Sequence, residues 1–155
     1  MSRIRPPRLL VALLALGVTL TGCTSTVTLQ PAEGANDPAC ARITAFLPDS
    51  VAGQQRRWTD AQATGAWGDP VSVILSCGVP APAVSELPCQ TVDGVDWLID
   101  DSEAPNYRFT TFGREPAVQV YVDYDVVSSF DVLSSLSKLV GKLPRTAQCT
   151  ERPGT

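Results

Sequence analysis

The residues best suited to chemistry form an acidic stretch in the second half of the chain, where Asp93, Asp96, Asp100, Asp101 and Glu103 lie within eleven residues. Clustered carboxylates supply the oxygen ligands that calcium prefers, and a pair of them can perform glycoside hydrolysis. The D-x-D-x-D-G spacing of a calcium loop is absent. A turn at Asp93 and a solvated loop at Asp100 and Asp101 explain the same residues without any ligand or reaction.

Other catalytic chemistries lack the residues that they require. The 155 residues include no His, which removes the usual base of hydrolases with a Ser or Cys nucleophile. No glycine spacing matches a phosphate-binding loop. The cysteines include no close C-x-x-C pair, so a zinc site is disfavoured. The sequence therefore predicts no catalytic residue, no metal site and no cofactor.

Four side chains form a candidate binding surface: Trp67, Arg114, Asp100 and Asp101. Trp67 lies among glycines and a proline and is predicted at the surface, whereas Trp97 shares an apolar run with its neighbours and is predicted in the core. Arg114 occupies the tip of an expected hairpin. We expect it to be solvated, with a carboxylate or an anion as the alternative partner.

Residues 1–23 have the features of an export signal. Three arginines within residues 1–8 precede the apolar run 9–20, which is about half the length that a membrane-spanning helix needs. The run ends in Leu20-Thr21-Gly22-Cys23, which resembles the bacterial lipobox. That resemblance implies a lipid on the Cys23 thiol and cleavage just before this residue. An uncleaved anchor, or a chance cysteine after an ordinary signal, are the alternatives.

These features divide the chain into a signal peptide (1–22), a flexible tether (23–36), one α+β domain (37–150) and a tail (151–155). The signal carries three of the 12 basic residues, so the mature chain has nine against 16 acidic residues, a net charge of −7. This charge disfavours nucleic acid and electrostatic docking on anionic lipid. Membrane attachment is therefore expected through the lipid alone.

The other four cysteines, Cys40, Cys77, Cys89 and Cys149, predict two disulfides in an exported domain. Three pairings are possible. Because a proline-rich loop separates Cys77 from Cys89, we predict a local bridge between these two. The second bridge would then join Cys40 to Cys149 and tie the ends of the domain together.

Local signals predict an α+β two-layer sandwich with helices on a mostly antiparallel sheet of four to five strands. Asp37 and Pro38 begin an N-terminal helix, and Ser128 with Asp131 caps a C-terminal one. Residues 59–69 are expected to form a turn, and Asp93-Gly94 a hairpin turn. Strands are expected at 54–59, 71–77, 91–99, 106–112 and 117–123. In the last of these strands, Val118, Val120 and Val122 are expected to point inward. The C-terminal helix is expected to carry an apolar stripe that includes Val132, Leu136 and Val140.

Three motifs, "AWGDPVSVILSCGV" (66–79), "VDGVDWLI" (92–99) and "TTFGREPAVQVYV" (110–122), together resemble a family of small actinobacterial envelope proteins catalogued as a domain of unknown function. The resemblance covers about residues 38–149. It implies an exported, membrane-attached protein and carries over no catalytic residue.

We therefore expect a non-enzymatic binding or scaffolding lipoprotein on the extracytoplasmic face of the cell membrane. Its expected partners are the lipid membrane, through the acylated N-terminus, and an unknown envelope protein or cell-wall component, but no nucleic acid. The alternative is a carboxylate-based hydrolase acting on envelope glycans. A lipoprotein that captures solutes is a third class, although 133 residues are few for a two-lobed binding protein.

Overall fold

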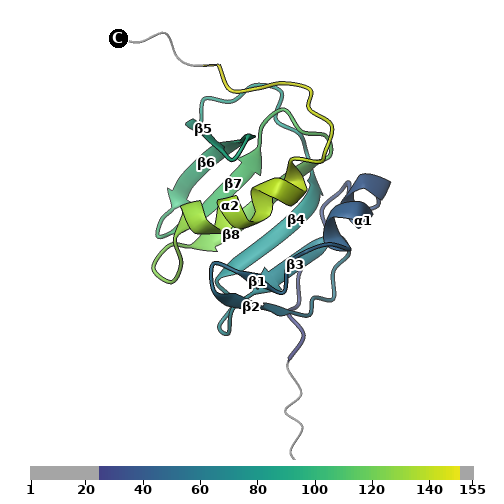
Figure 1. The fold of residues 1–155 in the computed structure, drawn as a ribbon, viewed down its shortest axis with the longest axis vertical. Coiled ribbons are helices and arrows are strands. Elements are labelled where there is room, and N and C mark those ends of the chain that lie inside the picture. Colours follow the sequence, from purple (N-terminus) through teal and green to yellow (C-terminus); the bar gives the residue numbers. More distant parts are fainter. Residues whose placement is uncertain (1–24, 151–155) are drawn as a thin grey trace, which may run out of the picture.

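A computed structural model describes residues 25–150 and divides them into two helices and eight strands (Figure 1). The elements in chain order are α1 (Pro38–Thr44), β1 (Ser50–Val51), β2 (Gln54–Arg57), β3 (Thr64–Trp67), β4 (Val73–Val79), β5 (Cys89–Val92), β6 (Val95–Glu103), β7 (Asn106–Thr111), β8 (Ala117–Asp123) and α2 (Ser129–Val140). The predicted signal peptide, the predicted lipidation site Cys23 and the predicted tail lie outside the described residues.

The eight strands form one antiparallel sheet in the order β1-β2-β3-β4-β8-β7-β6-β5. The predicted α+β sandwich with four to five strands is therefore wrong, since the described chain is mostly β with two short helices. At the centre of the sheet, Val73 and Leu75 of β4 pair with Val122 and Val120 of β8, and all four are fully buried. The predicted inward alternation of Val118, Val120 and Val122 is confirmed.

The strands that local signals missed include the short β1 and also β3, which occupies Thr64–Trp67 inside the expected turn. Pairing with β4 keeps this glycine-containing segment extended. Gly65 leaves room for the indole of Trp67, because a Cβ at Gly65 would lie 2.8 Å from that ring. Trp67 is consequently buried in the core, and the prediction that it lies at the surface is wrong.

The sheet curves around α2. This helix contacts β8 in the middle of the sheet and also β1 and β5, the strands at its two edges, and Figure 1 shows it lying in front of the strands. The expected apolar stripe of α2 is buried, including Val132, Leu136 and Val140. The curved sheet and the helix thus enclose one continuous core.

Both helices begin at the predicted capping residues. The Asp37 carboxylate accepts a hydrogen bond from Ala39 N at 2.7 Å, with Pro38 in the first turn. The Ser128 hydroxyl accepts one from Asp131 N at 3.4 Å. These caps satisfy backbone N–H groups that have no partner within the helix.

The four cysteines of the domain form two disulfides, as predicted, but the predicted pairing is wrong. Cys40 of α1 is bonded to Cys77 of β4, and Cys89 of β5 is bonded to Cys149. The first bridge holds α1 against the core-facing side of β4. The second holds the C-terminal segment against an edge strand. Sequence alone left three pairings open, and the local bridge across the proline-rich loop is not the one that forms.

Residues 25–36, expected to be a flexible tether, run along the domain and are hydrogen bonded to it. Val27 N donates to Trp58 O at 2.8 Å, Leu29 N to the Asp60 carboxylate at 2.9 Å, and Gly34 N to Gly78 O at 2.9 Å. In Figure 1, this end of the described chain and the C-terminal end lie at opposite poles of the long axis. None of the helices in the described residues has the length and apolar character needed to cross a membrane.

Candidate functional site

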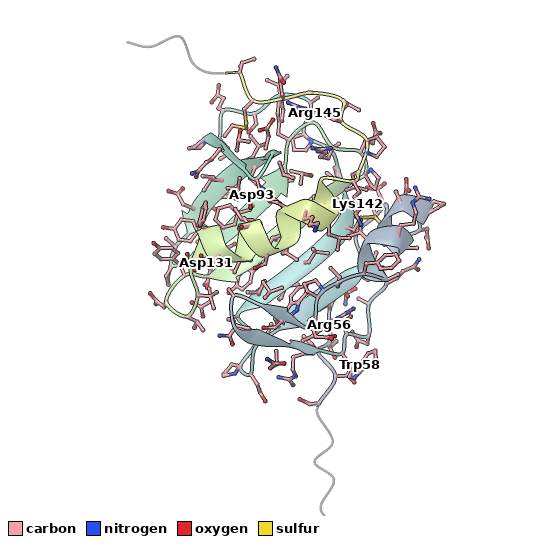
Figure 2. The ribbon with its side chains drawn as sticks, in the orientation of Figure 1. Arg56, Trp58, Asp93, Asp131, Lys142 and Arg145 are labelled. Atoms are coloured by element: carbon pink, nitrogen blue, oxygen red, sulfur yellow. A yellow bond between two sulfur atoms is a disulfide. The ribbon has the colours of Figure 1, made fainter. Side chains whose placement is uncertain are left out.

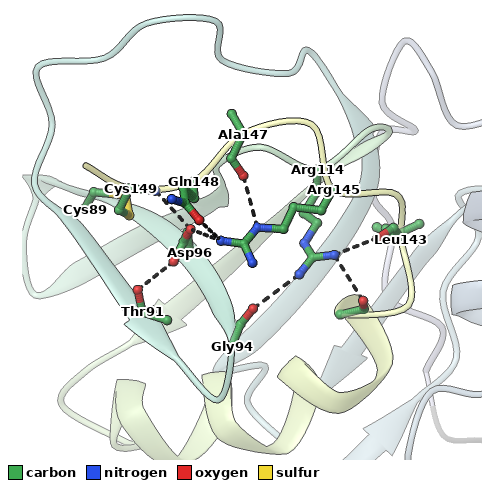
Figure 3. A network of polar contacts seen from close by, with 11 residues as sticks. Cys89, Thr91, Gly94, Asp96, Arg114, Leu143, Arg145, Ala147, Gln148 and Cys149 are labelled. Carbon is green, nitrogen blue, oxygen red and sulfur yellow. Dashed lines mark hydrogen bonds and ion pairs between the residues drawn. A yellow bond between two sulfur atoms is a disulfide. The ribbon is translucent and has the colours of Figure 1, made fainter. Parts of the chain in front are cut away.

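A network of polar contacts surrounds Arg114, in the turn between β7 and β8 (Figure 3). Its side chain runs inward and the residue is only 7% exposed. One terminal nitrogen donates to Gly141 O at 3.1 Å and to Leu143 O at 2.7 Å, and the other donates to Gly94 O at 3.2 Å. The prediction that Arg114 is solvated is therefore wrong.

This arginine joins two elements that are distant in sequence. Gly141 caps the C-terminus of α2, where carbonyl oxygens lack partners within the helix and carry partial negative charge. Gly94 lies in the turn between β5 and β6. Burial lowers the pKa of the Arg114 guanidinium, and the nearby charge of Arg145 acts in the same direction while that of Asp96 opposes it. The group remains charged because its intrinsic pKa is so high.

Asp96 is the second buried member of the network, at 7% exposure. Its carboxylate accepts hydrogen bonds from Thr91 Oγ1 at 2.6 Å and from Cys149 N at 3.0 Å. A terminal nitrogen of Arg145 lies 3.9 Å away, an ion pair at the limit of contact. Asp96 thus binds the C-terminal segment to the sheet.

The segment over Asp96, residues 144–150, is here called the C-terminal strap. Thr146 N donates to Gly113 O at 2.9 Å, and the Cys89–Cys149 disulfide fixes the far end of the strap. Gly113 has φ +64°, and a Cβ there would lie 2.0 Å from Ala147 O. Both the backbone conformation and the close approach of the strap therefore require glycine at this turn.

Two hollows flank the strap. The smaller, of about 510 Å³, is lined by Asp96, Arg145 and Gln148, and the larger, of about 1040 Å³, by residues 85–91 with Leu98 and Phe112. Thr91 and the last two strap residues, Cys149 and Thr150, line both. The wall of the larger hollow includes the apolar side chains of Leu87, Leu98 and Phe112, whereas the smaller hollow is lined mainly by polar residues.

The structure does not gather the acidic stretch into a site. The Asp93 carboxylate accepts a hydrogen bond from Ser134, Asp96 is used by the strap, and Glu103 pairs with Arg108 at 2.8 Å. Among residues 25–150, no group of three or more His, Cys, Asp or Glu side chains is placed to hold a metal ion. The geometry thus offers nothing in favour of a carboxylate-based hydrolase or a calcium site.

The predicted binding surface also separates into different parts of the molecule. Asp100 is half-buried and Asp101 exposed on β6, whereas Trp67 and Arg114 are buried elsewhere. Hydrogen bonds from Ser102 hold the pKa of Asp100 below its usual range, with a smaller contribution from the Arg108 charge. These four residues therefore do not form one surface. Trp97 is fully buried, as predicted.

A second arginine, Arg57, fastens the other end of the described chain. One of its terminal nitrogens donates to Ser25 O at 2.9 Å and to Ser25 Oγ at 3.0 Å, and the other donates to Gly68 O at 3.1 Å and pairs with Asp69 at 2.9 Å. Figure 2 shows Trp58, the next residue, at this same end of the molecule. Sequence reasoning missed this contact because nothing in the spacing links Ser25 to an arginine 32 residues later.

The chain matches the family described as "Protein of unknown function (DUF3515)" over residues 7–148. It belongs to that family. The matched range includes the apolar run 9–20 and Cys23 as well as the folded domain. No curated protein and no solved structure matches the chain.

Proposed function

We propose that this DUF3515 protein is an actinobacterial envelope lipoprotein, anchored to the extracytoplasmic face of the cell membrane through a lipid on Cys23. The lipobox-like Leu20-Thr21-Gly22-Cys23 and the apolar run before it motivate the proposal. The family match begins inside this signal-like segment, so it spans Cys23 and the domain together.

The observation that carries the proposal is that a residue close behind Cys23 in the sequence is bound to the domain. Ser25 already accepts two hydrogen bonds from Arg57, and Cys23 is only two residues earlier in the chain. A cut before Cys23 would therefore remove the signal and leave every described contact of the domain intact. The short distance in sequence between the lipobox and a segment bound to the domain supports processing at Cys23.

We propose that the anchored domain works as a binding or scaffolding module. The hollows beside the C-terminal strap supply the surface for an envelope protein or cell-wall component, and they lie near the pole opposite the N-terminal end. A lipid at Cys23 would leave this pole facing away from the membrane. The dispersal of the acidic side chains gives the alternative, a glycan hydrolase, no support from geometry.

Replacing Cys23 tests the anchor. We expect Cys23→Ala to lose labelling by a palmitate analogue and to leave the membrane fraction or accumulate as an unprocessed precursor, because the acylated thiol is gone. Mass spectrometry of the N-terminal peptide reports the lipid directly. Thr26→Ala, outside the four lipobox residues, is the matched control and should be labelled normally. A Cys23→Ala protein that still takes up the palmitate analogue contradicts the proposal.

Site-specific photocrosslinking in intact cells tests the binding module. A photoreactive residue at Leu87, which lines the larger hollow and is 42% exposed, should give discrete adducts with an envelope component. Val126, 55% exposed and in the loop before α2, is the matched control at another part of the surface. The same adduct pattern from both positions, or no adduct from Leu87, argues against partner binding at this hollow.

A further inference from the structure

Trp58 is unusual among the three tryptophans of the chain. Trp67 and Trp97 are fully buried, whereas Trp58 is 77% exposed directly after β2. Its backbone is nevertheless fixed, because Trp58 O accepts a hydrogen bond from Val27 N at 2.8 Å. A large apolar ring is thus held in solvent on a rigid part of the sheet, beside the N-terminal segment.

Covalent geometry places the proposed lipid close to this ring. Arg57 binds both the carbonyl and the hydroxyl of Ser25, so the start of the described chain is fixed beside the residue that precedes Trp58. Two residues of extended chain span at most about 7 Å, which limits how far Cys23 can lie from Ser25. A lipid on Cys23 would therefore bring the bilayer surface to this end of the domain.

The local charge permits such an approach. Within residues 54–69, Arg56 and Arg57 balance Asp60 and Asp69, so the segment around Trp58 carries no net charge although the chain is acidic. The indole combines a large apolar ring with one N–H donor, which suits the boundary between lipid headgroups and acyl chains. Anionic lipid is not needed for such an insertion.

We propose that Trp58 is a membrane-interface anchor, whose indole inserts into the headgroup region of the leaflet that holds the lipid at Cys23. This inference rests on the lipid attachment proposed above. The acyl chains provide the affinity, and Trp58 with the Arg57–Ser25 contact sets the orientation of the domain. The C-terminal strap and its two hollows then face away from the membrane, where an envelope partner can reach them.

Quenching of Trp58 fluorescence by brominated lipids tests the proposal. The chain from Cys23 onward contains every described residue and both disulfides, and Cys23 is then its one cysteine outside a disulfide. A maleimide lipid can therefore be coupled at that thiol and the product inserted into phosphatidylcholine vesicles, with or without brominated acyl chains. We expect Trp58 emission to shift to shorter wavelength on insertion and to be lost in the brominated vesicles.

Two variants test whether the quenched emission comes from Trp58. Trp58→Phe should remove the quenchable emission, since the two remaining indoles are buried in the protein. In that background, Val84→Trp places an indole at a 90% exposed position in the β4–β5 loop, and it should stay unquenched. Equal emission of Trp58 in brominated and plain vesicles overturns the proposal, as does quenching that requires anionic lipid. Because the lipid is attached chemically, such a failure leaves the result for natural lipidation of Cys23 untouched.

Discussion

The N-terminal and C-terminal ends of the domain are each held by an arginine and a disulfide, with Arg57 half-buried and Arg114 buried. Arg57 donates to the carbonyls of Ser25 and Gly68 at the N-terminal end. Arg114 donates to three carbonyls at the C-terminal end, those of Gly94, Gly141 and Leu143. The guanidinium suits both positions because its planar group of N–H donors can reach several backbone oxygens at once.

The two disulfides, in contrast, lie at different depths. Cys40 and Cys77 are completely buried and belong to the hydrophobic core, next to the apolar face of α1. Cys89 is exposed and Cys149 half-buried, and the strap that they hold lies over the polar network of Asp96. The Cys40–Cys77 bridge therefore reinforces apolar packing in the core. The Cys89–Cys149 bridge lies at the surface and holds a segment whose other contacts are mainly polar.

This difference indicates how each end would open. Release of α1 would expose the core residues Cys40 and Ile43 to water, which costs folding free energy. Release of the strap leaves the sheet and α2 packed around their core, so it is a local event with a smaller cost. The end with the two hollows is thus the one whose surface can change without unfolding the domain.

The largest expected effect is the loss of the core disulfide. The bridge spans 37 residues, and removing its constraint on the unfolded chain costs about 4 kcal/mol in the chain-entropy treatment. Cys40→Ala/Cys77→Ala also leaves a cavity in the core, which adds to the loss. We expect a lower free energy of unfolding by at least this amount, measured by urea denaturation.

Cys89→Ala/Cys149→Ala is the matched comparison. Its bridge spans 60 residues, so chain entropy alone predicts a loss at least as large as for the core bridge. We expect a smaller loss, because it cannot exceed what the strap itself contributes to stability. Mild reduction of the native protein should likewise open this exposed bridge first. Equal losses for the two double variants, or the reverse order, would show that the strap and core unfold as one unit.

The elements that the sequence predicted well are those set by local chemistry. The caps at Asp37 and Ser128, the Asp93-Gly94 turn and the alternating valines of β8 all act over a few residues, and all are present. The strand β3 was missed because pairing with β4, a contact between different segments, outweighs the turn tendency of its glycines. The sheet order and the curvature around α2 depend on such long-range contacts throughout.

The candidate site was harder to predict for the same reason. Arg114 was predicted to be exposed at a hairpin tip, because the carbonyls that bury it come from a helix end and a turn that lie 20 or more residues away on either side. The pairing of Cys89 with Cys149 likewise depends on where the strap crosses β5. The residue types indicated that Arg114 and the two cysteines would form specific contacts, but their partners are determined by long-range packing of the fold.

Substitution of Arg114 and of Arg145 compares the contribution of a buried charge to stability with that of an exposed one. Arg114→Ala should lower the free energy of unfolding by about 2–4 kcal/mol, because hydrogen bonds to charged groups contribute roughly 1.5–3 kcal/mol each and the variant leaves the buried Leu143 carbonyl without its donor. Arg145→Ala should cost less than about 1 kcal/mol, since its side chain is 51% exposed and lies 3.9 Å from Asp96. Urea denaturation of both variants measures the difference.

Arg114→Lys sharpens this comparison at constant charge. A lysine at residue 114 keeps the positive charge but lacks the planar fork that reaches both the C-terminus of α2 and Gly94 O, so it should recover only part of the lost stability. Full recovery would mean that charge near the helix C-terminus, rather than the geometry of the three hydrogen bonds, holds this end of the domain. If Arg114→Ala and Arg145→Ala instead lower the free energy of unfolding by small and equal amounts, Arg114 is solvated, as its place at a hairpin tip suggested.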